Sequence, residues 1–192
     1  MASISDYEIL RKLGQGAMGS VHLVRNAEGA TLALKSVAIC SKRDRELAAN
    51  EIRILRSLSH PSIVQFHDSF THGDDLCIVM EFCPCGDLAD LLGRQRAAMK
   101  RLPEPEVRAM LAQLTSALAH IHAARIVHRD IKSSNVFVSR QPGGAEGPHV
   151  LLGDFGVAKA LESTKAMACT QCGTPYYLPP EVCNGAPYNV KA

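Results

Sequence analysis

The chain has 192 residues, of which 46% are hydrophobic and 21% are charged, a composition typical of a folded globular protein. The net charge is only +2, so charge gives no reason to expect nucleic acid or a membrane as a partner. Neither an apolar run long enough to span a bilayer nor a signal peptide is recognisable. We therefore expect a cytoplasmic protein, with nuclear or cytoskeletal association left open.

Seven cysteines without a secretory signal predict reduced thiols rather than a disulfide framework. Two pairs lie close in sequence, Cys83 with Cys85 and Cys169 with Cys172. Together they could supply four thiolates to zinc, but the first pair has one intervening residue and no histidine spacing supports either pair. Inert thiols are the expectation, and a zinc site or a redox-sensitive Cys169–Cys172 pair are the alternatives.

Residues 7–24 contain two β-like runs that flank the glycines of LGQGAMGSV. Gly14, Gly16 and Gly19 fit the pattern G-x-G-x-x-G, which lets backbone amides approach a phosphate chain without interference from Cβ atoms. A dinucleotide-binding fold would need a helix at the third glycine, whereas the sequence after Gly19 alternates and is β-branched. The stretch therefore predicts a strand, a glycine loop and a second strand, and disfavours a Rossmann fold.

Another strand is predicted over residues 31–39, where Lys35 stands among alternating apolar residues and would be costly to bury alone. A helix is predicted from about Asp44 to Leu58, and its 3.6-residue period places an acid on the apolar face. That face consists of Leu47, Glu51, Ile54, Leu55 and Leu58. A Lys35–Glu51 pair would explain both charges, and two unrelated surface charges are the alternative.

The segments HPSIVQFHDSF and DDLCIVMEF, joined by a turn at residues 72–74, predict a β-hairpin that closes a small antiparallel sheet. The breaker Pro84-Cys85-Gly86 then marks a hinge between two lobes. Met80 lies just before the hinge, and ordinary core packing explains this residue as well as a role at the hinge does. Asp87 would reach a ribose or, in the preferred interpretation, cap the following helix. The apolar residues of that helix are Leu88, Leu91 and Leu92.

A long core helix follows Pro103 and Pro105 and leads into the polar loop HRDIKSSN at residues 128–135. Its apolar stripe consists of Val107, Met110, Leu111, Leu114, Leu118 and Ile121. In the loop, Asp130 offers a base, Lys132 a fixed positive charge and Asn135 an oxygen for a cation, a combination that fits phosphoryl transfer. After a hairpin around residues 139–149, Asp154 in LGDFG offers the carboxylate that Mg²⁺ prefers.

These motifs resemble, in order and spacing, the signature of eukaryotic protein kinases: the glycine loop to Val21, Lys35, Glu51, HRDIKSSN and Asp154-Phe155-Gly156. IVMEFC with GDL, HRDIKSSNVF, the glycine before Asp154 and TQCGTPYYLPPE are similar to the NIMA-related (Nek) serine/threonine kinases. The resemblance implies an α+β, two-lobed fold with ATP between the lobes. It assigns residues 7–192 to a partial kinase domain, 7–81 to the ATP-binding lobe and 82–192 to an incomplete larger lobe. Departures from the family pattern fall at Met18, Leu151 and Pro179, none of them a catalytic group.

The resemblance also implies the chemistry of individual residues. Asp130 would orient or deprotonate the acceptor hydroxyl, Lys132 would neutralise charge on the transferring phosphoryl group, and Asn135 with Asp154 would hold Mg²⁺. Lys35, held by Glu51, would anchor the phosphates. Contacts to ATP are implied for Leu13, Gly14, Gln15, Gly16, Ala17, Met18, Gly19, Ser20, Val21, Ala33, Lys35, Glu81, Cys83, Asp87 and Phe137.

Within that set, the backbone of Glu81 and Cys83 would contact adenine. The ring would be sandwiched by Val21, Ala33 and Phe137.

Partners and regulation are implied in the same way. Lys132, two residues after Asp130, resembles the Ser/Thr pattern, so the expected substrates are proteins with Ser or Thr acceptors. Arg129 would pair with a phosphate on Thr170, added by an activating kinase or by self-phosphorylation, and Thr174 would lie near Asp130. The sequence ends at residue 192, where a family member would continue, so a catalytically silent fragment or pseudokinase-like binding module is the alternative. A phosphotransferase that acts on a small molecule is a further alternative.

Overall fold

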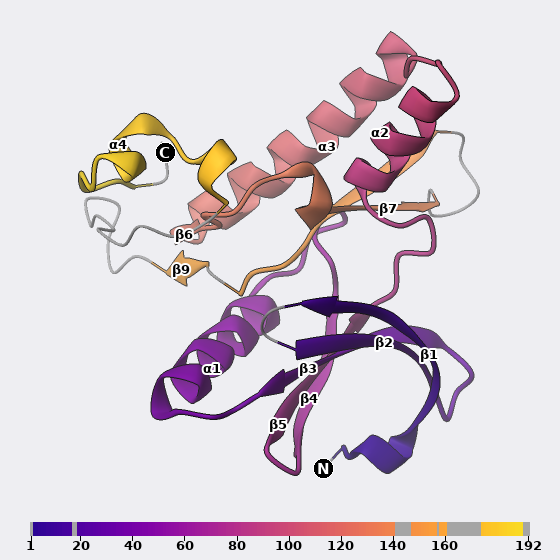
Figure 1. Cartoon of the computed structure of the whole chain (residues 1–192), viewed down its shortest axis with the longest axis vertical. Coiled ribbons are helices and arrows are strands. Elements are labelled where there is room, and N and C mark those ends of the chain that lie inside the picture. Colours follow the sequence, from indigo (N-terminus) through magenta and orange to yellow (C-terminus); the bar gives the residue numbers. More distant parts are fainter. Residues whose placement is uncertain (1, 17–18, 141–146, 157, 161–173, 190–192) are drawn as a thin grey trace. The chain divides into compact units, whose positions relative to one another are not determined.

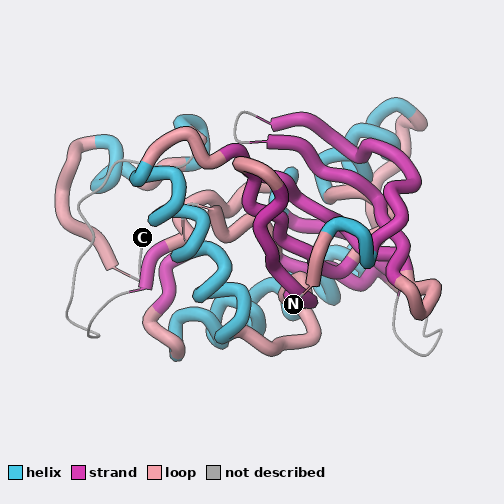
Figure 2. Tube along the Cα trace, turned by 90° about the horizontal axis from the view of Figure 1, so that it is seen from below, coloured by secondary structure: helices cyan, strands magenta, loops and turns pink. Residues whose placement is uncertain are grey.

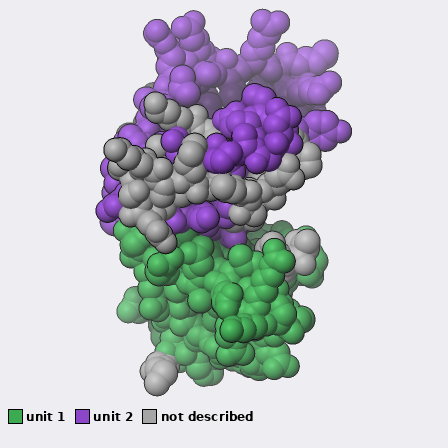
Figure 3. All heavy atoms as spheres, turned by 90° about the vertical axis from the view of Figure 1, so that its left-hand side faces the viewer, with its two compact units in different colours: residues 1–57, 65–82 green, residues 58–64, 83–192 purple. Residues whose placement is uncertain are grey.

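The computed structural model describes residues 2–16, 19–140, 147–156, 158–160 and 174–189. The chain divides into two compact units, coloured separately in Figure 3. Unit 1 comprises residues 1–57 and 65–82, and unit 2 comprises residues 58–64 and 83–192. Segment 58–64 therefore belongs to unit 2, although the chain on both sides of it belongs to unit 1.

Unit 1 is built on an antiparallel five-stranded sheet with the order β1-β2-β3-β5-β4, whose strands run side by side in Figures 1 and 2. Its elements are η1 (Ile4–Asp6), β1 (Tyr7–Gly16), β2 (Gly19–Asn26), β3 (Thr31–Ala38), α1 (Lys42–Ser57), β4 (Phe66–His72) and β5 (Asp75–Glu81). The predicted turn at residues 72–74 is confirmed, and Gly73 has the positive φ of 59° that such a turn favours. The expectation that the hairpin begins at His60 is wrong, because residues 60–64 bond within unit 2.

The two faces of this sheet carry different residues. The register pairs Val21 with Lys35 and Leu34 with Val79, and residues opposite each other point to the same face. One face holds an apolar core that packs against Ala2, Ile4 and Tyr7 and consists of Val24, Leu32, Leu34, Phe70, Cys77 and Val79. The other face carries Val21, Ala33 and Lys35, and α1 reaches it through Glu51.

Helix α1 begins at a serine cap, because the hydroxyl of Ser41 accepts a hydrogen bond from the Asp44 N–H at 3.1 Å. The predicted inward face is confirmed for Glu51, Ile54, Leu55 and Leu58, all of which are buried. The expectation for Leu47 is wrong, since this side chain is 43% exposed. Ala48 takes the buried position instead, about 100° further round the helix, where its small side chain allows a close approach.

Unit 2 contains the remaining helices and two short antiparallel strand pairs, β7 with β8 and β6 with β9. Its elements are α2 (Leu88–Ala97), α3 (Glu104–Ala123), β6 (Ile126–Val127), η2 (Ser133–Asn135), β7 (Val136–Arg140), β8 (Pro148–Leu152), β9 (Lys159–Ala160), η4 (Pro175–Tyr177) and α4 (Pro180–Cys183). The hairpin expected around residues 139–149 is confirmed as β7–β8, and the α+β class is confirmed for the chain.

Helix α3 is buried along a narrower stripe than its sequence indicates. Met110, Ala117 and Ile121 are buried, whereas Val107 is 44% and Leu111 is 63% exposed. The full stripe expected from periodicity is therefore wrong at Val107 and Leu111. The buried residues are spaced by seven and four positions and therefore lie on one side of the helix, which packs against β6 and β8.

Segment 58–64 is bound to β8 through its backbone. The Val64 N–H donates to the Leu152 carbonyl at 3.0 Å, and the Leu152 N–H donates to the Ser62 carbonyl at 2.9 Å. The buried His149 donates from Nε2 to the Pro61 carbonyl at 2.9 Å. These bonds join residues separated by nearly ninety positions in sequence.

His60 ties the same segment to α3. Its Nδ1 accepts a hydrogen bond from the Ser62 N–H at 3.0 Å, so the proton lies on Nε2, 3.0 Å from the Ser116 hydroxyl oxygen. The rings of His60 and His120 are 5.2 Å apart between centroids. Burial and the neighbouring His120 lower the pKa of His60 below its usual value, which favours this neutral form.

No helix within the described ranges has the length and hydropathy to cross a lipid bilayer.

Candidate active site

Lys35 on β3 and Glu51 on α1 form a buried ion pair in unit 1. Lys35 Nζ donates to Glu51 Oε1 at 2.7 Å, and the two side chains are 17% and 6% exposed. The sequence predicts this pair from two charges on apolar faces, and the structure brings them together. Because Glu51 is almost fully buried, removal of Lys35 would leave its carboxylate without the compensating charge of this pair.

The glycine loop lies between β1 and β2, whose register pairs Gly14 with Val21 and Gly16 with Gly19. A Cβ on Gly19 would lie 1.8 Å from the Ser36 carbonyl oxygen, so no side chain fits there. A Cβ on Gly14, in contrast, would meet nothing within 4 Å. Packing therefore explains Gly19, whereas the open space at Gly14 fits close approach of a phosphate-bearing ligand to the backbone.

Three other residues expected to contact ATP at this loop lie on β1 and β2. Leu13 is half-buried on β1, and Gln15 pairs with Ser20 in the β1–β2 register. Gln15 also donates from Nε2 to the Gly19 carbonyl at 3.2 Å. Ala17 and Met18 lie outside the described residues.

The residues expected around adenine lie on several elements. Ala33 lies opposite Met80 in the β3–β5 register, and the Glu81 N–H donates to the Gln65 carbonyl at 2.9 Å, both within unit 1. Cys83 is buried in unit 2, and Phe137 is half-buried on β7.

Asp87 caps α2. Its Oδ1 accepts a hydrogen bond from the Asp90 N–H at 2.8 Å, which confirms the preferred interpretation of this residue as a helix cap.

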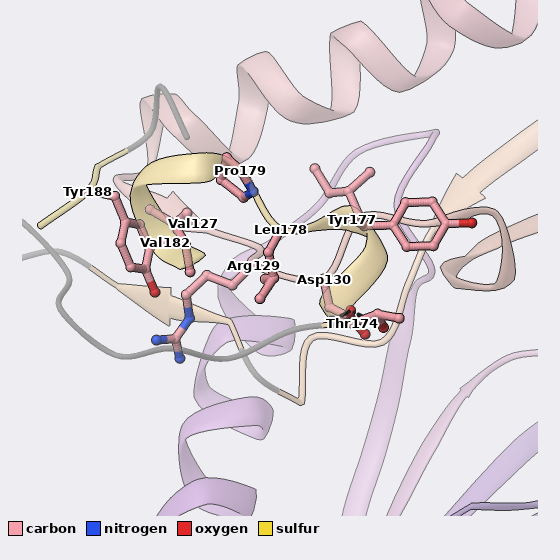
Figure 4. Close-up of a pocket in the computed structure, with 10 residues that line it drawn as sticks. Val127, Arg129, Asp130, Thr174, Tyr177, Leu178, Pro179, Val182 and Tyr188 are labelled. Carbon is pink, nitrogen blue, oxygen red and sulfur yellow. Dashed lines mark hydrogen bonds between the residues drawn. The ribbon is translucent and has the colours of Figure 1, made fainter. Parts of the chain in front are cut away.

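Asp130 is the centre of the polar site in unit 2, because its two carboxylate oxygens accept from four groups. Oδ1 accepts from the backbone N–H of Thr174 at 2.8 Å and from its hydroxyl at 2.7 Å. Oδ2 accepts from Lys132 Nζ at 2.8 Å and from Asn135 Nδ2 at 2.9 Å. Figure 4 shows Asp130 and Thr174 side by side in a small cavity of the same unit.

The hydroxyl of Thr174 is held between the acid and the cation of this loop. Lys132 Nζ donates to Thr174 Oγ1 at 2.6 Å, while the same hydroxyl donates to Asp130. Burial raises the pKa of Asp130, but the hydrogen bonds from Lys132, Thr174 and Asn135 outweigh burial and leave that pKa below its ordinary value. Asp130 is therefore ionised at neutral pH and able to accept from a hydroxyl.

His128 supports this loop from beneath and is only 1% exposed. Its Nδ1 accepts from the Asp130 N–H at 3.3 Å, so Nε2 carries the proton and donates to the Gly153 carbonyl at 2.9 Å. Its ring packs against Phe155 at 4.8 Å between centroids. Burial lowers the pKa of His128, which keeps the ring neutral and suits both hydrogen bonds.

Asn135 and Asp154 lie at the same end of the β7–β8 hairpin, because the Gly153 N–H donates to the Asn135 carbonyl at 3.0 Å. Nδ2 of Asn135 donates to both the carbonyl and the carboxylate of Asp130, which leaves its amide oxygen as the atom able to bind a cation. The exposed Asp154 has a φ of 57°, a strained value for a residue with a side chain. One amide and one carboxylate oxygen fit Mg²⁺ that takes its other ligands from phosphates and water.

Close packing explains why the residue before Asp154 is a glycine, Gly153. A Cβ at this position would lie 2.7 Å from Phe137 Cε2 and 2.9 Å from Val64 Cγ2. The backbone of Gly153 therefore packs directly against two apolar side chains, and this close packing fixes the residue that precedes the candidate metal ligand.

Arg129 and Asp130 project in different directions in Figure 4, although they are neighbours in sequence. Arg129 has a φ of 70° and lines the cavity with Asp130 and Thr174. Thr170, its expected phosphorylated partner, lies outside the described residues, as do Cys169 and Cys172.

Cys85 is a free thiol of intermediate exposure, and Cys83 is buried. Within the described ranges, no group of three or more His, Cys, Asp or Glu side chains could hold a metal ion by itself.

Two contributors to the site were not singled out from the sequence. His128 could have been recognised from a lone histidine between the apolar pair Ile126–Val127 and the charged loop. The contact of Gly153 with Phe137 and Val64 has no local signal, because it joins three separate parts of the chain.

A strand lysine paired with a helix glutamate, together with an Asp-Lys-Asn loop beside an Asp-Phe-Gly turn, is the pattern of a protein kinase catalytic domain. The model of the family described as protein kinase domain matches residues 7–192. The chain belongs to this family.

Three similar proteins carry the name serine/threonine-protein kinase. Nek1 of Mus musculus is 39% identical over 189 residues, which cover 97% of this chain and 15% of that protein. Nek3 of Mus musculus is 40% identical, covering 98% of this chain and 35% of the relative, and Nek8 of Danio rerio is 39% identical, covering 97% and 26%. The chain spans 15% to 35% of the length of these relatives, and its resemblance to NIMA-related kinases is confirmed.

Proposed function

We propose that this chain is the catalytic part of a serine/threonine protein kinase that transfers the γ-phosphoryl group of ATP to Ser or Thr hydroxyls of proteins. The observation that carries the proposal is the placement of the Thr174 hydroxyl between Asp130 and Lys132. This pair already binds an aliphatic alcohol through an acceptor on one side and a cation on the other, so a substrate hydroxyl of the same kind fits the same groups.

The role of Asp130 follows from its ionisation. The donors around it keep its pKa low, so the carboxylate is a good hydrogen-bond acceptor but a weak base. We infer that Asp130 first orients the acceptor hydroxyl and takes up its proton as the oxygen forms its bond to the γ-phosphorus, while the bond from that phosphorus to the oxygen of the departing ADP breaks. Lys132, bonded to the same carboxylate, is placed to neutralise charge that develops on the transferred group.

ATP would supply the phosphoryl group, and Mg²⁺ would neutralise phosphate charge when bound. The residues present fit these cofactors: Gly14 leaves its backbone open, Lys35 offers a fixed cation, and Asn135 with Asp154 offers hard oxygen ligands. The adenine contacts proposed for Glu81 and Cys83, and the packing of its ring by Val21, Ala33 and Phe137, remain predictions.

Regulation through Thr170 is also part of this proposal. A phosphate on Thr170 would pair with Arg129 and raise activity, whether an activating kinase or the chain itself adds it. The proposed partners are protein substrates, and a cytoplasmic location remains a prediction.

The test is transfer of radiolabelled phosphate from ATP, with Mg²⁺ present, to otherwise identical peptides with Ser, Thr or Tyr as the sole acceptor. We expect labelling of the Ser and Thr peptides, and its loss in Asp130→Asn. ATP binding without transfer to any peptide would instead support a catalytically silent binding module. Preferred labelling of the Tyr peptide would contradict the Ser/Thr assignment.

A further inference from the structure

The turn from α2 into α3, at the tip of these helices in Figure 1, concentrates positive charge. Residues 91–103 contain no Asp or Glu, but they contain the four cations Arg94, Arg96, Lys100 and Arg101. The whole chain has 21 Lys and Arg against 19 Asp and Glu, so the rest of it has 17 cations against 19 acids. The entire positive excess of the chain therefore lies in this one turn.

Three of these four cations have no ion-pair partner among the described residues. Arg94 donates from Nη2 to the Cys85 carbonyl at 3.0 Å, which fixes its side chain against the chain itself. Arg96, Lys100 and Arg101 are exposed and form no ion pair with any carboxylate of the described ranges. Three solvated cations are therefore available for a ligand of opposite charge.

Met99 occupies a backbone position that glycine usually fills. The Met99 N–H donates to the Arg96 carbonyl at 3.0 Å, and the Lys100 N–H donates to the Gln95 carbonyl at 2.9 Å. These two bonds form a Schellman motif that closes α2, and they require a left-handed residue directly after the cap, where Met99 has a φ of 52°. A side chain at this φ is strained, whereas glycine is not.

The strained residue gains no packing in return, because Met99 is 94% exposed. An apolar side chain held outward at a backbone cost points to a role outside the fold. Leu92, one helical turn before Arg96, is 44% exposed on the same side of α2 and adds apolar surface. The turn thus combines a projecting flexible apolar side chain with solvated cations.

We propose that Leu92, Arg96, Met99, Lys100 and Arg101 form a docking surface for an acidic segment of a partner protein that carries an apolar side chain. Carboxylates of the segment would pair with the three cations, and Met99 would cover the apolar residue, since methionine adapts to irregular contacts. Residues 91–103 contain no aromatic side chain on which a nucleic-acid base could stack. One methionine and one half-exposed leucine give less apolar surface than a membrane-binding helix uses. The surface is independent of phosphoryl transfer.

The probe is a short fluorescent peptide of Glu and Asp residues around one central Leu, with binding to the whole chain followed by anisotropy. Lys100→Glu combined with Arg101→Glu is expected to weaken binding about tenfold or more, because two attractive charges become repulsive. The matched control is Arg43→Glu with Arg45→Glu on α1, which makes the same charge change at exposed positions and should leave binding within about twofold.

Met99→Gly separates docking from folding. It relieves the positive φ, so this variant should melt at the same temperature as the parent chain or higher, yet bind the leucine peptide about fivefold more weakly. A peptide with Ala in place of Leu should bind the parent chain and Met99→Gly equally. This pattern would assign Met99 to contact with the apolar residue.

Three results would overturn the proposal. The first is no binding of the peptide by the parent chain, and the second is equal weakening by the α1 control pair. The third is tighter binding to phosphatidylserine vesicles or to oligothymidylate than to the peptide, with loss on charge reversal at Lys100 and Arg101. That third result would assign the surface to a membrane or to nucleic acid.

Discussion

Two lysine–carboxylate pairs among the described residues, one in each unit, have nearly the same length but different surroundings. Lys35 and Glu51 lie 2.7 Å apart and join a strand to a helix, while Lys132 and Asp130 lie 2.8 Å apart within one loop. Asp130 also accepts from Asn135 and from two groups of Thr174. The first pair links α1 to β3, whereas the second is one bond in a network that keeps Asp130 ionised. Distance alone would not distinguish them, but substitution should.

The largest expected effect follows removal of the Asp130 charge. Asp130→Asn should lower kcat for a Ser or Thr peptide by a factor of about one hundred or more, because the amide neither orients the hydroxyl as strongly nor accepts its proton. ATP affinity should barely change if, as proposed, Asp130 contacts the acceptor and not ATP. Initial rates at saturating ATP and a separate ATP-binding measurement provide the check, and near-normal turnover would remove Asp130 from the mechanism.

The next effect tests the pair in unit 1 through stability. Lys35→Met should destabilise the fold by about 2 kcal/mol, which is below the ~3–5 kcal/mol typical of breaking a fully buried pair, because Lys35 is 17% exposed. Adding Glu51→Leu should restore most of this loss, because no unpaired charge then remains. Urea unfolding of the single and double variants measures both steps.

Lys42→Met is the matched control for this experiment. Lys42 lies 3.9 Å from Glu46 on α1 but is 91% exposed, so its loss should leave stability nearly unchanged. A Lys42→Met loss as large as that of Lys35→Met would mean that burial does not govern the pair.

A smaller effect is expected at Thr174. Thr174→Val keeps the backbone N–H bond to Asp130 but removes both hydroxyl bonds, so activity should fall by about tenfold and the pKa of Asp130 should rise. Thr174→Ser should recover most of the activity because it restores the hydroxyl. A peptide-phosphorylation rate profile from acid to neutral pH measures both quantities. Equal rates for the Val and Ser variants would show that only the backbone of Thr174 matters.

The smallest effect is the dependence of stability on pH. Burial lowers the pKa values of His60 and His128, so the folded chain resists protonation while the unfolded chain takes up protons from about pH 6.5 downward. Their stabilisation is present above that pH and is lost as pH falls towards the lower folded pKa. Asp130, with its pKa below 3.8, loses its contribution only in more acidic solution.

Thermal melts between about pH 7.5 and about pH 5.5 should therefore fall in midpoint. His60→Gln should flatten this trend, because one of the two histidines whose pKa is lowered in the fold is gone. His72→Gln, at the exposed end of β4, should keep the parent slope. A parent chain with a constant midpoint over this range would show that these histidines do not couple folding to protons.

Local patterns in the sequence predicted much of this structure. Alternating apolar residues and turn residues predicted the sheet, the Gly73 turn and the β7–β8 hairpin. Two charged residues on otherwise apolar faces predicted the Lys35–Glu51 pair. These features depend on residues close together in sequence or on charges that need a partner. The loop 128–135 was recognised because its polar residues occur within one short stretch.

The errors arise where distant parts of the chain decide the outcome. Periodicity alone put Leu47, Val107 and Leu111 on buried faces, but the exposed side of a helix depends on what packs beside it. The predicted hairpin included His60, whereas the hydrogen bonds of this residue go to Ser62 and Ser116 within unit 2. The exposed Met99 was not anticipated because the left-handed residue after a helix is usually glycine.

The interruption of unit 1 by segment 58–64 also has a consequence for how the chain is made. The carbonyls of Pro61 and Ser62 and the N–H of Val64 form hydrogen bonds with His149 and Leu152. During synthesis, the ribosome must therefore complete β8 before this segment can settle, although the strands of unit 1 leave the ribosome much earlier. Contacts so distant in sequence slow folding, because a long loop must close first. Segment 58–64, which follows α1 directly, would lack these hydrogen bonds on a nascent chain until β8 has emerged.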